Sequence, residues 1–193
     1  MNEEKMEINK EENKENRNIM KELLHIVIYV LSILAVTYLI IHFVGQRTIV
    51  VGTSMRDTLQ DGDNLVVDKI TYRMKDPERF DIIVFPYQYE EDVYYIKRII
   101  GLPGETVQID EEGQIFINGE VLNEDYGREV IQDPGMAIEP ITLGEEEYFV
   151  LGDNRNASED SRFEDVGVIH MDDIVGRAIF RIYPFSSFGK ITD

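Results

Sequence analysis

A lysine within an apolar run is the residue in this chain with the clearest chemical potential. Lys97 lies in the middle of residues 93–101, VYYIKRIIG, and the turn signal Gly101-Leu102-Pro103-Gly104 ends the run. Valine, tyrosine and isoleucine favour β-strands, and side chains alternate between the two faces of a strand. Lys97 therefore shares a face with Tyr95 and Ile99. Both faces are mostly apolar, so we expect the strand to be covered on both sides.

An ammonium group held in such a strand loses its hydration, and desolvation lowers the pKa of a lysine. A lysine that is neutral near about pH 8 can act as a general base. The alternative is that the aliphatic stem of Lys97 lies on apolar surface while its amine reaches water. The strand alone is compatible with both interpretations.

A serine and a polar loop are the other candidate functional elements. Ser54 lies in residues 51–59, VGTSMRDTL, and becomes a nucleophile if a base removes its proton. The run 152–162, GDNRNASEDSR, follows an apolar strand-like segment. It is either an exposed loop or a scaffold in which charged side chains pair and Ser158 orients a nearby amine. The residues expected to form the charge-paired clamp are Asp153, Asp160 and Arg162.

Other chemistries find little support in the sequence. The chain has no cysteine, and His170 is its only histidine after the apolar N-terminal segment, where VIHMDD gives it no special context. No HExxH or Cys/His spacing predicts a metal site, no glycine-rich motif predicts a nucleotide cofactor, and the net charge of −19 argues against nucleic acid. If the chain performs covalent catalysis, Ser54 with Lys97 is the remaining pairing.

The N-terminal part of the chain predicts a membrane anchor. Residues 1–22 are rich in Glu, Asn and Lys and are expected to form a disordered cytoplasmic tail. Residues 23–45 are expected to form a transmembrane helix, because 23–44 hold no Asp, Glu, Lys or Arg and would span about 33 Å as a helix. A buried core helix is the alternative. Basic residues are more frequent before this segment than just after it, which places residues 46–193 outside the cell.

The rest of the chain predicts a mainly β domain. Short apolar runs alternate with Gly, Asn and Pro turn signals, which is typical of antiparallel sheets in a sandwich or barrel. Residues 123–146 show no clear periodicity and are expected to form a loop-rich lobe. The expected strands are 48–51, 64–70, 80–85, 93–101, 106–110, 114–117, 120–122, 147–151 and 174–183.

Five short motifs stand in order behind the apolar segment. They are SMRDTL at 54–59, GD at 62–63, RFDIIVF at 79–85, KRIIGLPG at 97–104, and the run 152–162, which begins GDNR and holds Ser158, Asp160, Ser161 and Arg162. Together they closely resemble the type I (leader) signal peptidases, in the short single-span form typical of Gram-positive bacteria. The resemblance covers the apolar segment and nearly all of residues 48–183.

The resemblance implies a mainly antiparallel β fold whose catalytic face rests on the outer membrane surface. It implies that Ser54 attacks the scissile carbonyl, that Lys97 is the general base, and that Ser158 hydrogen-bonds the lysine amine. The Ser54 N–H would point at the developing oxyanion. Some members add a hydroxyl two positions before the nucleophile; this chain has Gly52 there, so its oxyanion hole should rest on backbone donors. By similarity, the residues bracing the site are Asp153, Asp160 and Arg162.

The resemblance also implies the substrate. It predicts removal of N-terminal signal peptides from secreted pre-proteins at the cell membrane, with cleavage after small residues of the Ala-x-Ala type and without a cofactor. An anchored enzyme and a membrane-held precursor share one plane, which raises their effective concentration. The residues that match the positions lining the shallow pockets for small side chains are Val50, Met55, Leu59, Tyr95 and Ile96.

One position departs from the family pattern, and two other functions stay open. The family has proline three residues after the serine, where this chain has Asp57. A carboxylate close to Lys97 would favour the ammonium form, whereas an exposed one would do little. The alternatives are a specialised member that processes a narrow set of exported proteins such as pilins, and an inactive tethered β-domain that binds them.

Overall fold

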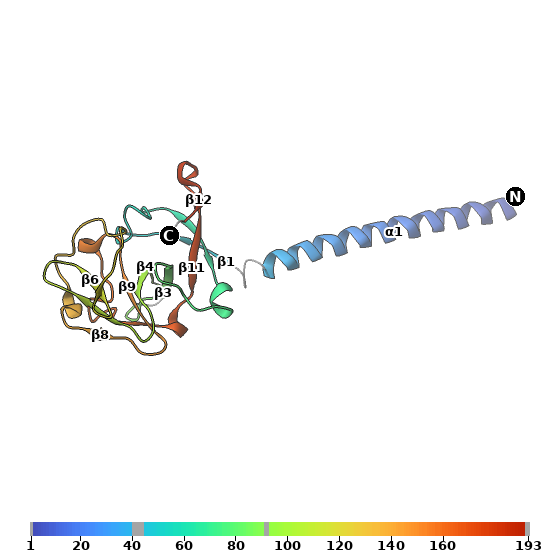
Figure 1. Ribbon diagram of the computed structural model, residues 1–193. Coiled ribbons are helices and arrows are strands. Elements are labelled where there is room, and N and C mark those ends of the chain that lie inside the picture. The colour runs from blue at the N-terminus through green and yellow to red at the C-terminus, as the bar shows by residue number, and fades with distance from the viewer. Residues whose placement is uncertain (1, 40–44, 91–92, 192–193) are drawn as a thin grey trace. The chain divides into compact units, whose positions relative to one another are not determined.

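The computed structural model describes residues 2–39, 45–90 and 93–191, and the chain divides into two units. The described residues of the first unit, which runs from 1 to 43, form the helix α1 (Asn2–Leu39) (Figure 1). The second unit, residues 44–193, is built almost entirely of short β-strands. The prediction of a mainly β domain preceded by one long apolar helix is confirmed.

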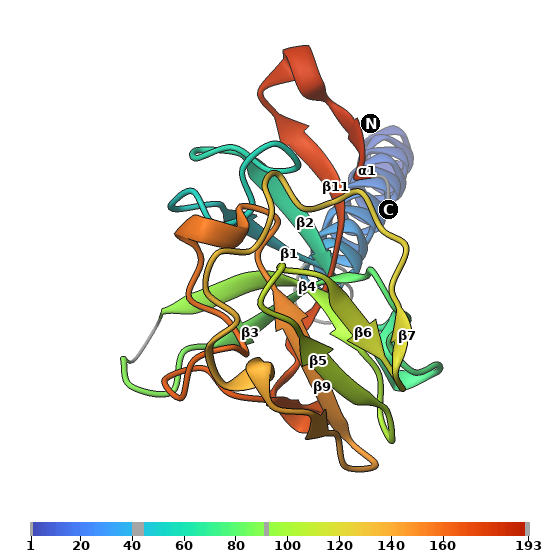
Figure 2. The ribbon, with the colours of Figure 1, turned by 60° about the vertical axis from the view of Figure 1, so that its left-hand side comes forward.

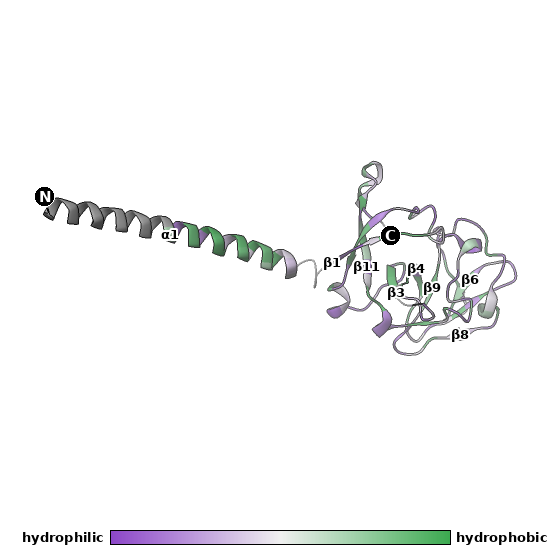
Figure 3. Cartoon of the chain, turned by 180° about the vertical axis from the view of Figure 1, so that it is seen from behind, coloured by the Kyte–Doolittle hydropathy of each residue, from purple (hydrophilic) through white to green (hydrophobic). Residues whose placement is uncertain are grey.

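Helix α1 contains a stretch with the length and composition of a membrane span. Met20–Tyr38 is 19 residues long and has a mean hydropathy of 1.8, and Figure 3 shows the hydrophobic colouring along it. A helix of this length measures about 28 Å, close to the hydrocarbon thickness of a bilayer. The large apolar side chains described along this stretch are exposed, as expected for a helix surrounded by lipid. Residues 40–44 of the expected span lie outside the described residues.

The segment before the span differs from the expectation. Its composition predicts disorder for residues 1–22, but the structure describes Asn2–Leu39 as one continuous helix. Glu and Lys, which dominate the segment, are good helix formers. The apolar stretch also provides a helix that the preceding residues extend without a new nucleation step, which is the costly step of helix formation.

An antiparallel sheet of eight strands forms the larger part of the second unit. Its order is β1-β2-β11-β3-β4-β9-β10, and β12 pairs with β11 beyond this path. The strand that carries Lys97, β4, lies between β3 and β9. The bounds are β1 (Gly45–Ile49), β2 (Asn64–Asp68), β3 (Ile82–Pro86), β4 (Tyr94–Gly101), β9 (Glu147–Leu151), β10 (Ile169–His170), β11 (Gly176–Tyr183) and β12 (Gly189–Lys190).

A smaller antiparallel sheet lies beside it, with the order β7-β6-β5-β8 (Figure 2). Asn118 and Gly119, both at positive φ, form the tight turn between β6 and β7. Residues 123–146 hold one 3-10 turn and the two-residue strand β8, and are otherwise irregular. The bounds are β5 (Thr106–Ile109), β6 (Ile115–Ile117), β7 (Glu120–Val121), β8 (Ile141–Thr142), and the 3-10 turns η2 (Thr71–Arg73), η3 (Gly135–Ile138), η4 (Arg155–Ala157), η5 (Met171–Asp173) and η6 (Phe185–Ser187).

Strand β4 is covered on both faces, as its sequence predicts. Ile99 packs in a core cluster with Ile83 and Val150, whereas Ile100 packs in a second cluster that joins the two sheets. Every residue of β4 from Lys97 onward is buried. Burial on both faces means that two charged side chains, Lys97 and Arg98, are held inside the domain, where each needs a partner.

Phe149 on β9 tests whether the cluster between the sheets holds the domain together. It is fully buried and belongs to a cluster with residues of both sheets, including Ile100 on β4 and Val107 on β5. Phe149→Ala should lower the free energy of unfolding by about 3–5 kcal/mol, measured by chemical denaturation of the full chain in detergent. The exposed Val121→Ala is the matched control and should change it by less than about 0.5 kcal/mol. Equal stability of the two variants would contradict this account of the core.

Candidate active site

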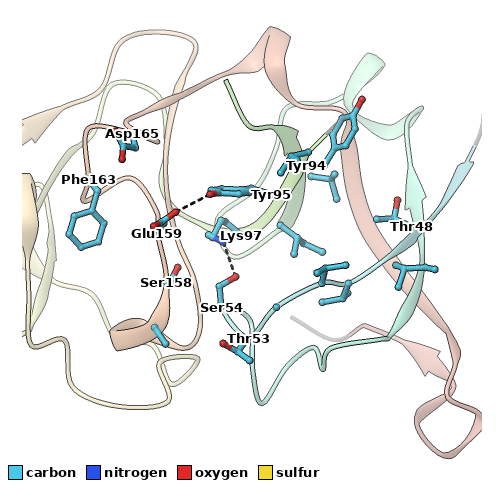
Figure 4. Close-up of a pocket in the computed structure, with 18 residues that line it drawn as sticks. Thr48, Thr53, Ser54, Tyr94, Tyr95, Lys97, Ser158, Glu159, Phe163 and Asp165 are labelled. Carbon is cyan, nitrogen blue, oxygen red and sulfur yellow. Dashed lines mark hydrogen bonds between the residues drawn. The ribbon is translucent and has the colours of Figure 1, made fainter. Parts of the chain in front are cut away.

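Lys97 and Ser54 meet in the structure. The Nζ atom of Lys97 lies 2.8 Å from the Oγ atom of Ser54 and donates a hydrogen bond to it (Figure 4). The lysine comes from the centre of β4, and the serine from the turn that follows β1. Only 4% of Lys97 is exposed. The alternative in which the amine of Lys97 reaches water is therefore excluded.

The environment of Lys97 favours the neutral amine. Burial lowers the pKa of Lys97 to about 8, because the charged form loses its hydration. Three carboxylates act in the opposite direction, in the order Asp160, Glu159 and Asp153. The ring of Tyr95 lies 4.8 Å from Nζ and covers the amine on one side. The result is a lysine that holds a usable fraction of neutral amine near neutral pH.

The turn that carries Ser54 is fixed by the polar loop 152–162. The backbone N–H of Asn154 donates to the Ser54 carbonyl at 2.9 Å, and its side-chain amide donates to the Thr53 carbonyl at 3.0 Å. Both bonds join segments about one hundred residues apart in the sequence. They set the direction in which the backbone passes through Ser54.

Gly152 allows this close approach. A Cβ atom at Gly152 would lie 2.5 Å from the Ser54 carbonyl oxygen and 2.2 Å from the Ser158 hydroxyl. Both distances are far below van der Waals contact, and the first involves backbone that has little room to move. A side chain at position 152 would therefore push the turn that carries Ser54, the candidate nucleophile, away from the loop. This turn is called the nucleophile turn below.

Asp153 pairs with an arginine of the lysine strand. Arg98 donates to both carboxylate oxygens of Asp153, from Nε at 2.9 Å and from Nη2 at 2.8 Å, and both residues are completely buried. The hydroxyl of Thr58 also donates to Asp153, and the guanidinium lies over the ring of Tyr126 at 3.8 Å. This bidentate pair links the polar loop to β4 and, through Thr58, to the turn that follows Ser54.

Asp160 and Arg162 form a second buried pair. The Nε atom of Arg162 donates to Asp160 at 2.7 Å, and Asp160 also accepts from the N–H of Gly152 at 3.1 Å. The predicted clamp of Asp153, Asp160 and Arg162 is thus two separate pairs. Asp153 turns toward β4 because it follows β9, which is hydrogen-bonded to β4 next to Arg98.

Ser158 does not make the predicted hydrogen bond to the lysine amine. It lines the same cleft (Figure 4), but its buried hydroxyl has no hydrogen-bond partner within the part of the chain that the structure describes. The single short hydrogen bond of the amine is to Ser54. Ser158 therefore lies in the same cleft as Ser54 and Lys97, and its hydroxyl group is free both to donate and to accept a hydrogen bond.

A cleft of roughly 950 Å³ opens over Ser54 and Lys97. Val50, Tyr95 and Ile96 line it, as predicted for pocket residues. Met55 and Leu59 do not: they are buried beneath the nucleophile turn in a core cluster with Leu65 and Ile82. They face inward because the turn closes over the core, with the Leu59 N–H bonded to the Met55 carbonyl. Their role is to support the floor of the cleft.

The N–H of Ser54 is a free backbone donor at the site. Within the described residues the N–H of Ser54 has no acceptor, whereas the N–H of Gly52 donates to Asp61 at 2.8 Å. Gly52 has a φ of +97°, which is strained for other residues. Its contribution is the backbone conformation that presents Ser54, and the Ser54 N–H remains available to an oxyanion.

Asp57 occupies a position that proline cannot adopt. Its φ is +86°, whereas the ring of proline fixes φ near −65°. The carboxylate forms an exposed ion pair with Arg128 at 3.2 Å and is not among the charges that perturb Lys97. The turn in this chain therefore differs locally from a turn built on proline, while its charge stays away from the amine.

The patterns in the sequence did not identify several residues that support the site. Arg98, Asn154 and Glu159 each contact the site, yet only Arg98 carried a usable signal. A fully buried arginine in an apolar strand requires a carboxylate partner, which in this fold is Asp153. The hydrogen bonds of Asn154 and the contact between Glu159 and Tyr95 depend on loop geometry that no pattern specifies. Among the described residues, no group of three or more acidic or histidine side chains is arranged to hold a metal ion.

Comparison with known proteins gives a consistent result. The family described as "Signal peptidase, peptidase S26" matches residues 21–183. The chain is 38% identical over 157 residues to "Probable signal peptidase I-2" of Synechocystis, covering 78% of this chain and 69% of that protein. It is 37% identical over 159 residues to "Signal peptidase I P" of Bacillus subtilis subsp. natto, covering 79% and 84%. The crystal structure of a signal peptidase I from Enterococcus faecalis V583 is 36% identical, covers 53% of this chain and 97% of that chain, and gives a TM-score of 0.42.

The pKa of Lys97 can be measured directly. We expect a pKa of about 8 for the Lys97 amine. In the Glu159→Gln variant this pKa should be lower, because the Glu159 carboxylate stabilises the ammonium form. Carbon-13 NMR of Cε-labelled lysine in the full chain measures both. Glu164→Gln, which removes an exposed carboxylate that does not line the cleft, is the control and should leave the titration unchanged. A Lys97 pKa near about 10.4, the value of a solvated lysine, would show that the amine is not desolvated.

A second prediction follows from the positive φ of Asp57. Asp57→Pro should lower the free energy of unfolding by more than about 1 kcal/mol, because proline is incompatible with the native backbone. Asp57→Asn is the matched control: asparagine tolerates positive φ, and the loss of an exposed ion pair costs at most about 1 kcal/mol. Denaturation of the full chain in detergent measures both. A proline variant as stable as the asparagine variant would contradict the observed turn.

Proposed function

This chain belongs to the signal peptidase family, peptidase S26, and from that premise we propose that Ser54 and Lys97 are the catalytic dyad with which it cleaves signal peptides. The observation that carries the proposal is the 2.8 Å contact between a buried lysine amine and a serine hydroxyl. A serine needs a base to become nucleophilic, and within the described residues that line the cleft, Lys97 is the group placed to accept its proton.

In the first half of the reaction, the neutral amine of Lys97 accepts the proton of the Ser54 hydroxyl as Oγ attacks the scissile carbonyl carbon. The carbonyl oxygen becomes an oxyanion, and the N–H of Ser54 is the backbone donor available to it. The ammonium of Lys97 then gives its proton to the leaving amine as the peptide bond breaks. The products are an acyl ester on Ser54 and the free N-terminus of the mature protein.

In the second half, water takes the place of the leaving amine. Lys97, again neutral, accepts a proton from water as the water oxygen attacks the ester carbonyl. Collapse of the second oxyanion breaks the bond to Ser54, and Lys97 returns the proton to Oγ. We assign to Ser158, whose buried hydroxyl has no hydrogen-bond partner in the described structure, the role of accepting a hydrogen bond from the amine when the lysine is charged.

The shape of the cleft supports cleavage after small residues. The apolar side chains on one side of Ser54 come from the end of β1 and the residues after it and from the start of β4, and they include Val50 and Ile96. Shallow apolar pockets accommodate alanine-sized side chains and exclude large or charged ones. We therefore assign Ala-x-Ala-type substrates to this enzyme, with the residues before the cut in this apolar part.

The apolar stretch of α1 supports a membrane location. Members of this family act on pre-proteins that are held in the membrane by their signal peptides, and Met20–Tyr38 has the properties of an anchor. We assign the N-terminus to the cytoplasm, because basic residues are concentrated before the span. This orientation places the β domain on the outer face, where translocated precursors emerge.

Substitution of the dyad tests the proposed chemistry. Ser54→Ala, Lys97→Ala and Lys97→Arg should each reduce kcat/KM for a detergent-solubilised pre-protein by at least about 10³-fold, since arginine cannot supply a neutral base. Exposed residues of the same types, in Ser187→Ala and Lys75→Ala, are the controls and should cleave normally. Normal processing by any of the three dyad variants would remove the assignment, even if the family assignment remained.

A further inference from the structure

The cleft has two chemically different arms that meet at Ser54. One arm is apolar and is lined by the ends of β1 and β4. The other arm is formed by the loop after β9 and holds Glu159, Phe163 and Asp165. Figure 4 shows these three residues on one side of the Ser54–Lys97 pair, with Thr48 and Tyr94 on the other side. A peptide whose scissile bond lies at Ser54 must therefore contact both arms.

Glu159 is fixed at the edge of the cleft. Its carboxylate accepts a hydrogen bond of 3.0 Å from the hydroxyl of Tyr95. The ring of Tyr95 is in turn stacked on Tyr87, with centroids 4.6 Å apart and planes 9° apart. The carboxylate is thus held at a defined place beside the reacting groups, which distinguishes it from a freely rotating surface glutamate.

The charge of this arm is not neutralised by the protein. Within the described part of the chain, neither Glu159 nor Asp165 forms an ion pair, and Lys97 is the only cationic side chain among the residues lining the cleft. The two buried carboxylates nearby, Asp153 and Asp160, are each paired with an arginine. The acidic arm therefore presents a local negative field to whatever peptide occupies it.

We propose that Glu159 and Asp165 make this arm select against acidic residues, and in favour of basic ones, on the mature side of the cleaved bond. The inference rests on the proposed function. Small residues before the cut occupy the apolar arm, so the first residues after the cut extend along the acidic arm. The selected class is a cationic or neutral segment at the start of the mature protein.

The expected effect is moderate because both carboxylates are exposed. An exposed pair of opposite charges changes an equilibrium by a factor of about two to five. When a basic residue of the substrate is replaced by an acidic one, its attraction to the two carboxylates becomes repulsion. We expect lysine to be preferred over glutamate by about five- to tenfold in kcat/KM, and the preference to weaken at high salt, where exposed charges are screened.

The test compares matched substrates on the same enzyme. Full-length protein in detergent is given pre-protein peptides that differ only in carrying Lys, Ser or Glu at the second or third position after the cut. The ratio of kcat/KM for Lys over Glu is measured at one pH, so any change in Lys97 protonation cancels. Glu159→Gln and the double variant Glu159→Gln/Asp165→Asn should lower the ratio stepwise toward one, whereas the control Glu164→Gln should retain it.

The outcomes separate this inference from the function on which it rests. Cleavage of the Ser peptide that depends on Ser54 establishes the function, whatever the charge preference. A ratio near one in the wild type, or a ratio unchanged in the double variant, would overturn the charge selection. Loss of Ser-peptide cleavage by the wild type would instead remove the proposed function itself.

Discussion

The removal of one lysine amine from water is the constraint on which the rest of the domain depends. A lysine in solution is almost entirely charged at neutral pH, and a charged amine has no lone pair with which to accept a proton. Strand β4 lies between two other strands and is packed on both faces, so Lys97 has little contact with water. The packing of the whole sheet compensates for the free-energy cost of burying the amine. The burial in turn lowers the pKa of Lys97.

The arginines around the site protect this lowered pKa. Asp153 connects the polar loop to β4 and to the turn that carries Ser54, and Asp160 braces the loop from within. As free carboxylates, both would favour the charged form of Lys97. Arg98 and Arg162 pair with them in buried, bidentate geometry. Each carboxylate–guanidinium pair has a net charge close to zero. Asp153 and Asp160 can therefore brace the site while burial still determines the protonation of the Lys97 amine.

Much of this arrangement was predictable from the sequence, because its strongest signals are local. Period-two alternation identified β4 and its two apolar faces, and five short motifs in order, with the family resemblance that they carry, identified Ser54 and Lys97. What the sequence could not provide is the direction of side chains in loops and turns. Met55 and Leu59 face the core and not the cleft, Asp153 pairs with Arg98 and not with Arg162, and Ser158 makes no bond to the amine. These differences depend on how distant segments dock, which no local pattern encodes.

The hydrogen bonds between Asn154 and the nucleophile turn also have a consequence for biosynthesis. They join residues about one hundred positions apart, and such long-range contacts form late in folding because a long loop must close first. A growing polypeptide that has emerged only as far as the smaller sheet carries the serine and the lysine but lacks Asn154, whose two hydrogen bonds fix the backbone around the serine. Under the proposed mechanism, the site is therefore complete only when nearly the whole domain has been synthesised, so a shortened chain that ends before Asn154 would hold the serine and the lysine without being competent for hydrolysis.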